Sequence, residues 1–136
     1  MTIREKISYF CKRKDSIKEL TIDNDMRDLL YSVLEDYGTA CVNLSYYAKK
    51  EGYEYPETVD IGGWLKMPIL VLKPTLGDIV VWGNGKPTYV GIFISRVEGL
   101  IYTLEVNNGI EFKSFPIELV QGYRKLHKIN TDEFYS

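Results

Sequence analysis

Histidine is almost missing from this sequence, cysteine is scarce, and no long apolar run is present. Of 136 residues, one is histidine and two are cysteine. The Cys and His residues do not form the closely spaced pairs that are typical of zinc sites, so we expect no metal and no other cofactor. The longest apolar run, residues 67–72, is interrupted by Pro68 and is too short to span a bilayer.

An excess of positive charge is also missing. The chain has 17 basic and 19 acidic residues and a net charge of -2. Because a surface that binds phosphates needs sustained positive charge, nucleic acid is not expected as a partner. The first residues lack the apolar stretch of a signal peptide. We therefore expect the protein to be made in a cytoplasm and to stay there unless something carries it out.

The N-terminal part of the sequence has helical periodicity. Hydrophobic residues make up 45% of the chain, which is enough for the core of one domain. Residues 2–14 carry an apolar stripe at helical spacing that includes Cys11, and we assign no chemistry to that cysteine. A second helix is predicted from Asp23 or Asn24 to Tyr37. Residues 53–75, with three prolines and Trp64, predict a structured loop.

The C-terminal part has the pattern of strands. Five short segments are rich in β-branched or aromatic residues: 78–82, 89–95, 100–106, 110–114 and 122–126. Asn-Gly pairs at 84–85 and 108–109 predict hairpins. We therefore predict an α+β fold, with N-terminal helices packed on a 5- to 6-stranded antiparallel sheet. Residues 1–37 would supply the N-terminal helices, 38–127 the core of the same domain, and 128–136 a C-terminal tail.

Cys41 is the candidate nucleophile. Thr39 is a good N-cap, and a helix from there to Gly52 would place Cys41 in its first turn. The positive end of a helix dipole lowers the pKa of a thiol and raises its reactivity. The alternative is structural, because Cys41 shares a helical face with Leu44 and Ala48 and would then be a small core residue.

Strand alternation indicates which side chains share a face of the sheet. Val90 and Ile92 lie on one face of their strand, whereas Tyr89 and Gly91 lie on the other. On the next strand, Glu105 and Asn107 share a face. A thiol acyl-transfer site needs a cysteine, a base and a polar orienting group. Glu105 and Asn107 are candidates for the polar groups, although the segment also reads as a strand that leads into a tight turn.

Five motifs in order carry a resemblance to a known family. They are residues 38–42, 77–82, 89–93, 104–107 and 122–124. Over roughly residues 38–126 the chain resembles the papain-like cell-wall hydrolases of the CHAP and NlpC type, which cleave amide or peptide bonds of peptidoglycan. The resemblance implies a papain-like fold, with Cys41 as the nucleophile and with Glu105 and Asn107 as the polar pair.

The sequence departs from this family at the catalytic base. The family has a histidine directly before its Val-Gly-Ile pattern, and this chain has Tyr89 there. A tyrosine titrates near pKa ~10 and is a poor acceptor for a thiol proton at neutral pH. The one histidine, His127, follows the last predicted strand and is expected to be an exposed residue between Lys125 and Lys128.

Three functional hypotheses follow. The first is a catalytically inactive member of this family with a binding or structural role. Tyr89, Tyr55 and Trp64 would then form a cleft for peptidoglycan fragments or for virion or tail proteins. The family occurs in bacteriophage tails and lysis modules, which implies a virion-associated location. The second is an active amidase or endopeptidase that uses Cys41 with an unusual base, such as His127, Glu105 or a group from a partner. The third is an unrelated α+β interaction domain.

Overall fold

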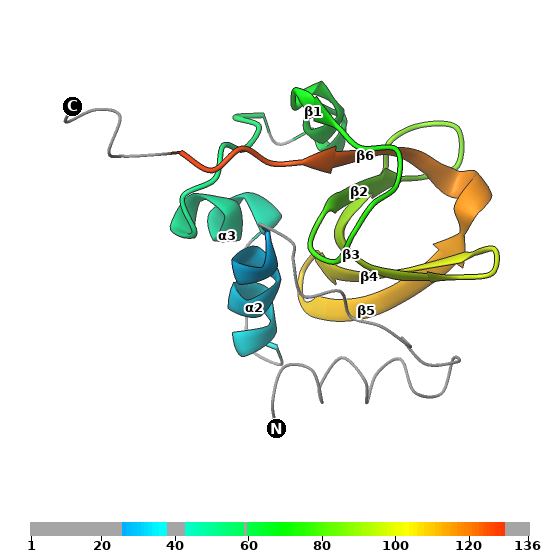
Figure 1. The fold of residues 1–136 in the computed structure, drawn as a ribbon, viewed down its shortest axis with the longest axis horizontal. Coiled ribbons are helices and arrows are strands. Elements are labelled where there is room, and N and C mark those ends of the chain that lie inside the picture. Colours follow the sequence, from blue (N-terminus) through cyan, green and yellow to red (C-terminus); the bar gives the residue numbers. More distant parts are fainter. Residues whose placement is uncertain (1–25, 38–42, 59, 130–136) are drawn as a thin grey trace.

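The computed structural model describes residues 26–37, 43–58 and 60–129, and it has the predicted α+β content (Figure 1). In these described segments, a six-stranded antiparallel sheet is accompanied by two short α-helices and two 3₁₀-helices. In chain order the elements are α2 (Arg27–Glu35), α3 (Leu44–Lys50), η2 (Ile61–Lys66), β1 (Ile69–Leu70), β2 (Ile79–Trp82), β3 (Tyr89–Val97), β4 (Leu100–Val106), β5 (Ile110–Pro116), η3 (Ile117–Leu119) and β6 (Val120–Lys125). The predicted helix over residues 2–14 lies outside the described residues.

The sheet has the order β1-β6-β2-β3-β4-β5. Strands β2 to β5 form a meander, as the two Asn-Gly pairs predicted. Gly85, Asn108 and Gly109 have positive φ angles of 82°, 56° and 156°, which is the backbone conformation that tight hairpin turns require. The chain then passes through η3 and returns to the free side of β2, so that the sheet curves strongly (Figure 1).

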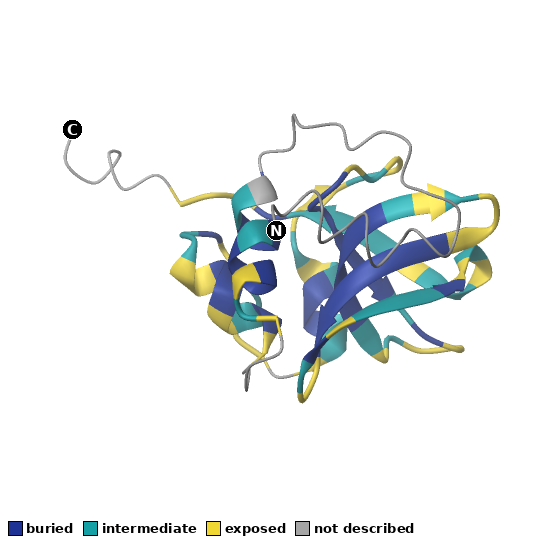
Figure 2. Cartoon of the chain, turned by 90° about the horizontal axis from the view of Figure 1, so that it is seen from below, coloured by how far each residue is buried: buried dark blue, intermediate teal, exposed yellow. Residues whose placement is uncertain are grey.

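The sheet has two apolar faces. One packs against α2 and α3, where Leu30, Val33, Leu44 and other helix residues join strand residues such as Ile92 in the main core. The other face carries a smaller cluster of Val80, Phe93, Ile101 and Phe115. Figure 2 shows the two helices on one side of the strands, with buried residues where they meet. The predicted alternation along β3 and β4 is therefore confirmed.

Helix α3 begins later than the sequence predicted. Asn43 is its N-cap, with extended backbone angles, and the Asn43 side chain accepts a hydrogen bond from the Tyr46 N–H. The predicted cap at Thr39 is therefore not the start of α3, because Asn43 caps it instead. The prediction that Cys41 lies in the first turn of this helix is wrong, since position 41 precedes the N-cap. The end of the helix agrees with the prediction, since Gly52 has a φ of 83°. Residues 38–42 lie outside the described residues.

The predicted loop over residues 53–75 contains two elements that the sequence did not reveal, namely η2 and the two-residue strand β1. Helix η2 is capped by Asp60, whose side chain accepts from the Gly62 N–H. Strand β1 pairs with β6, and the Arg124 guanidinium donates to the carbonyls of Leu65 and Met67. These hydrogen bonds attach the loop to the sheet.

A polar contact joins α2 to the C-terminal end of the fold. The Tyr53 hydroxyl donates to Oδ1 of Asp28, and the Lys128 ammonium lies 2.6 Å from Oδ2 of the same carboxylate. Tyr53 and Lys128 also form a β-bridge, and the Ile129 N–H donates to the Gly52 carbonyl at 2.7 Å. The fold therefore includes Lys128 and Ile129 of the predicted tail 128–136, and residues 130–136 are outside the described residues.

Candidate functional site

A cavity of about 420 Å³ lies where the start of α3, the segment before η2, the start of β3 and the end of β4 meet. The residues that line it include five of the six predicted site residues: Tyr55, Trp64, Tyr89, Glu105 and Asn107. The sixth, Cys41, lies outside the described residues. Its near neighbours Asn43 and Ser45 line the cavity. Segments far apart in sequence are thus brought together at one place.

Tyr89 and Asn107 are neighbours across two strands. Gly91 pairs with Glu105 in the register of the antiparallel strands β3 and β4. Tyr89 lies two residues before Gly91 and Asn107 two residues after Glu105, which places both on the same side of this pair. Asn107 is exposed, and its backbone N–H donates to the Gly109 carbonyl at 2.8 Å in the hairpin turn. Tyr89 and Asn107 therefore lie at the same edge of the cavity.

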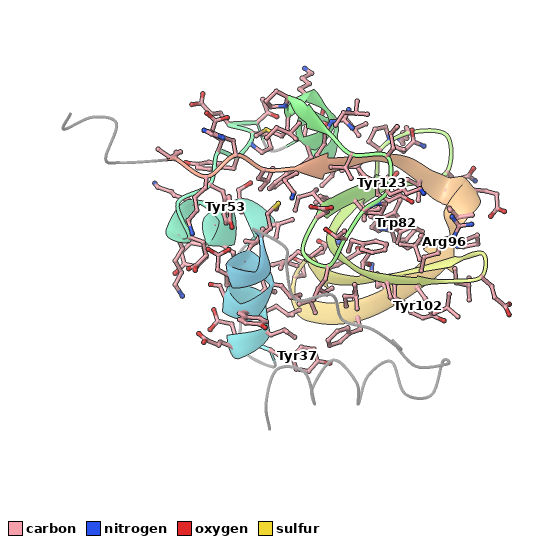
Figure 3. The ribbon with its side chains drawn as sticks, viewed as in Figure 1. Tyr37, Tyr53, Trp82, Arg96, Tyr102 and Tyr123 are labelled. Carbon is pink, nitrogen blue, oxygen red and sulfur yellow. The ribbon has the colours of Figure 1, made fainter. Side chains whose placement is uncertain are left out.

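The ring of Tyr89 nevertheless packs on the other face of the sheet from α3. It stacks on the Trp82 ring at 4.3 Å between centroids, and Trp82 in turn stacks on Phe115 at 4.0 Å. The Lys113 ammonium lies 4.5 Å from the centroid of the Tyr89 ring. Trp82 and Phe115 belong to the smaller apolar cluster and not to the one that contains α3. Figure 3 labels Trp82 within the curve of the sheet.

The carboxylate of Glu105 is held by three neighbours. Its side chain is 1% exposed, and Oε2 accepts hydrogen bonds from the Trp82 indole at 2.7 Å and the Thr103 hydroxyl at 2.8 Å. The Lys113 ammonium lies 3.7 Å from Oε1. Burial raises the pKa of Glu105 above its usual value, because the hydrogen bonds and Lys113 only partly offset the loss of water around the carboxylate.

The two aromatic candidates differ in how much surface they offer. Trp64 is 3% exposed and is part of the main core, so that it shapes the wall of the cavity but offers little ring surface to a ligand. Tyr55 is half-buried and packs against the same core. Of these two residues, Tyr55 is the more accessible to a bound molecule.

His127 lies elsewhere. Its backbone carbonyl accepts a hydrogen bond from the Glu54 N–H at 2.8 Å, and the residue is exposed, as the sequence predicted. It is not among the described residues that line the cavity.

Comparison with known proteins found no relative of this chain. No family model, curated protein or solved structure matches the chain. Within the described residues, no group of three or more Asp, Glu, Cys and His side chains is placed to hold a metal ion. No helix in the same parts of the chain is long and apolar enough to cross a membrane.

Sequence reasoning missed three residues that contact the Glu105 carboxylate and influence its pKa. Trp82, Thr103 and Lys113 come from β2, β4 and β5. Thr103 could have been found, because it lies two residues from Glu105 on the same strand and therefore on the same face. Trp82 and Lys113 could not, because their contacts depend on the strand order and register.

Proposed function

We propose that this chain is a CHAP/NlpC-like domain of papain-like fold that has lost hydrolytic activity and binds a ligand in the cavity beside α3. The single observation that supports it most is the composition of the cavity wall. Residues from two of the five family-like motifs, 89–93 and 104–107, line this cavity, but no histidine is among its described lining residues.

The environment of Tyr89 also supports a binding role. A base for Cys41 would have to accept a proton, and a phenol at neutral pH does not do this well. The Tyr89 ring is already in contact with Trp82 and Lys113. In this proposal Tyr89 is part of the support of the cavity wall, and Tyr55 and the polar residues of the wall contact the ligand.

Peptidoglycan fragments are the first ligands to test, because the resemblance names them. Proteins of a bacteriophage virion or tail are the second class of partner, since domains of this family serve there. Both classes expose amide and hydroxyl groups. The neutral polar side chains of the cavity wall, such as Asn43, Ser45 and Asn107, can form hydrogen bonds with such groups.

One observation favours an alternative, an active thiol amidase or endopeptidase. The pKa of Glu105 is raised by burial, which is the property that a carboxylate needs in order to act as a base near neutral pH. Against this alternative, Oε2 of Glu105 is occupied by two hydrogen bonds and Oε1 faces Lys113.

The experiment compares native protein with Cys41→Ala in two assays, hydrolysis of purified peptidoglycan and binding of soluble peptidoglycan fragments. Cys11→Ser is the matched control for loss of a thiol. We expect no hydrolysis by any of the three proteins and equal binding by all of them. Hydrolysis by the native protein and Cys11→Ser that is lost in Cys41→Ala would establish the enzyme instead.

A second measurement does not depend on the choice of ligand. In Cys11→Ser, the pH dependence of alkylation reports on Cys41 alone. An apparent pKa at or above the free value of ~8.5 is expected for an inactive site. A value in the range of ~4 to 7 would mean that the site still generates a thiolate and would contradict the proposal.

A further inference from the structure

The cavity wall has an uneven distribution of charge. Among the described residues that line it, the charged ones are Glu57 and Glu105, and none is Lys, Arg or His. The undescribed residues next to these segments, 38–42 and 59, carry no charged side chain in the sequence. The described part of the wall therefore carries two carboxylates and no cation.

Lys113 is in contact with one of the lining carboxylates, but it does not reverse the negative sign of the charge at the wall. Lys113 lies behind the wall, 3.7 Å from Glu105 and 3.4 Å from Glu111. Lys113 thus pairs with two of the three carboxylates Glu57, Glu105 and Glu111. A concave site with an excess of one sign concentrates ligands of the opposite sign and disfavours ligands of the same sign.

Aromatic side chains accompany the carboxylates. Tyr55 is two residues before Glu57 on the same segment, and both line the cavity, with Tyr55 half-buried and Glu57 exposed. A carboxylate beside an aromatic side chain is suited to an ammonium group, which is attracted to the charge and to the face of the ring. A carboxylate or phosphate ligand would find no ion-pair partner among these lining residues.

We propose that the cavity binds its ligand through a primary ammonium group next to Glu57 and Tyr55, and that it discriminates against carboxylate and phosphate ligands. This inference rests on the proposed binding function and names the chemical class of the ligand. Glu57 is the residue that determines specificity, because Glu105 is already occupied by Trp82, Thr103 and Lys113.

The test uses three small probes of similar size: Nα-acetyl-lysine N-methylamide, its Nε-acetylated form, and Nα-acetyl-glutamate N-methylamide. Binding is followed by NMR shift changes of the cavity residues in the full chain labelled with ¹⁵N. We expect the lysine probe to bind about threefold or more tightly than its acetylated form, and the glutamate probe to bind most weakly. An exposed ion pair accounts for a difference of this size.

Two variants assign the effect to one residue. Glu57→Gln is expected to lower the affinity for the lysine probe about threefold and to leave the acetylated probe unchanged. Glu54→Gln is the matched control, because Glu54 is exposed and does not line the cavity; we expect it to bind all three probes as the native protein does. High salt should weaken binding of the lysine probe and have little effect on the acetylated one.

The inference is overturned if the lysine probe fails to bind, if the three probes bind equally, if glutamate is preferred, or if Glu57→Gln behaves like Glu54→Gln. Its failure can be distinguished from failure of the proposed function. Peptidoglycan fragments that shift the cavity residues without the ammonium preference would leave the binding function standing. Absence of binding by all probes and all fragments would contradict both the ammonium preference and the proposed binding function.

Discussion

The Trp82 indole on β2 donates a 2.7 Å hydrogen bond to Glu105 on β4, although β3 lies between these two strands. The contact is possible because β3 has a glycine where the Glu105 side chain crosses it. A Cβ atom at Gly91 would lie 2.6 Å from Cγ of Glu105. The glycine of the Val-Gly-Ile pattern thus has a packing role in this chain.

Gly91→Ala is expected to lower the free energy of unfolding by about 1–3 kcal/mol, because the added methyl group overpacks the site. Besides Glu105, it would approach the Cβ of Thr103 to 3.1 Å. Urea denaturation of both proteins measures the difference. Gly99→Ala is the matched control, since a Cβ there meets nothing within 4 Å. Equal stability of the two variants would show that Glu105 moves aside without loss.

Glu105→Gln should change how stability depends on pH. Burial raises the pKa of Glu105 above its usual value of 4.5, so that the folded protein holds the proton more tightly than the unfolded chain. The contribution of Glu105 to stability is therefore fully present below pH 4.5 and is lost as pH rises through the folded pKa.

Relative to Glu105→Gln, which does not titrate, the native protein should lose stability as pH rises above 4.5 through the folded pKa of Glu105. Urea denaturation at several pH values gives both curves. A difference between the two proteins that stays constant with pH, or that changes in the native protein's favour as pH rises, would contradict the raised pKa.

Asp28→Asn should have the opposite pH dependence. Burial alone would raise the pKa of Asp28, but the Lys128 ammonium and the Tyr53 hydroxyl together lower it below 3.8. We expect a loss of about 1 kcal/mol at neutral pH, from weaker hydrogen bonds to the Tyr53 hydroxyl and the Lys128 ammonium. The loss should shrink as pH falls below 3.8 through the folded pKa, because the native carboxylate is then protonated.

The measurement for Asp28→Asn is thermal or urea unfolding at neutral and acid pH. Glu35→Gln is a suitable control, because Glu35 is exposed on the same helix. An equal effect of the two substitutions at neutral pH would mean that the contact with Tyr53 and Lys128 adds nothing to stability.

Tyr89→His introduces the residue that CHAP and NlpC hydrolases have before their Val-Gly-Ile pattern, but we expect no gain of peptidoglycan hydrolysis. The side chain at this position packs on the face of the sheet opposite α3, against Trp82 and Lys113. Loss of the stacked ring should also lower stability by about 1 kcal/mol. Tyr89→Phe, which keeps the ring, should retain native stability. Hydrolysis by Tyr89→His would show that a single substitution is what separates this chain from an active enzyme.

The sequence by itself determined the local features of this protein. The Asn-Gly pairs specify positive φ angles, and the hairpins of β2–β3 and β4–β5 form there. The two-residue alternation determined that Val90 and Ile92 face the helices while Gly91 faces the smaller cluster. Both are properties of a few neighbouring residues, so they can be read without knowing the fold.

The arrangement of the candidate site depends on more than these local features. The sequence named five of the residues that line the cavity: the ordered motifs supplied Tyr89, Glu105 and Asn107, and the proline-containing loop supplied Tyr55 and Trp64. It could not say that Glu105 would turn toward Trp82 or that the Trp64 ring would be buried in the core. Nor could it choose between Thr39 and Asn43 as the N-cap of α3, since both residue types cap helices well.

Tertiary structure decided the pKa of Glu105 and the packing of the Tyr89 ring. The pKa of Glu105 depends on burial and on Lys113, which reaches it from β5, the neighbouring strand of the sheet. The Tyr89 ring is held by a tryptophan on β2 and approached by that same lysine. Such contacts follow from the register of four strands and the curvature of the sheet, which are cooperative properties of the whole chain and not of any one segment.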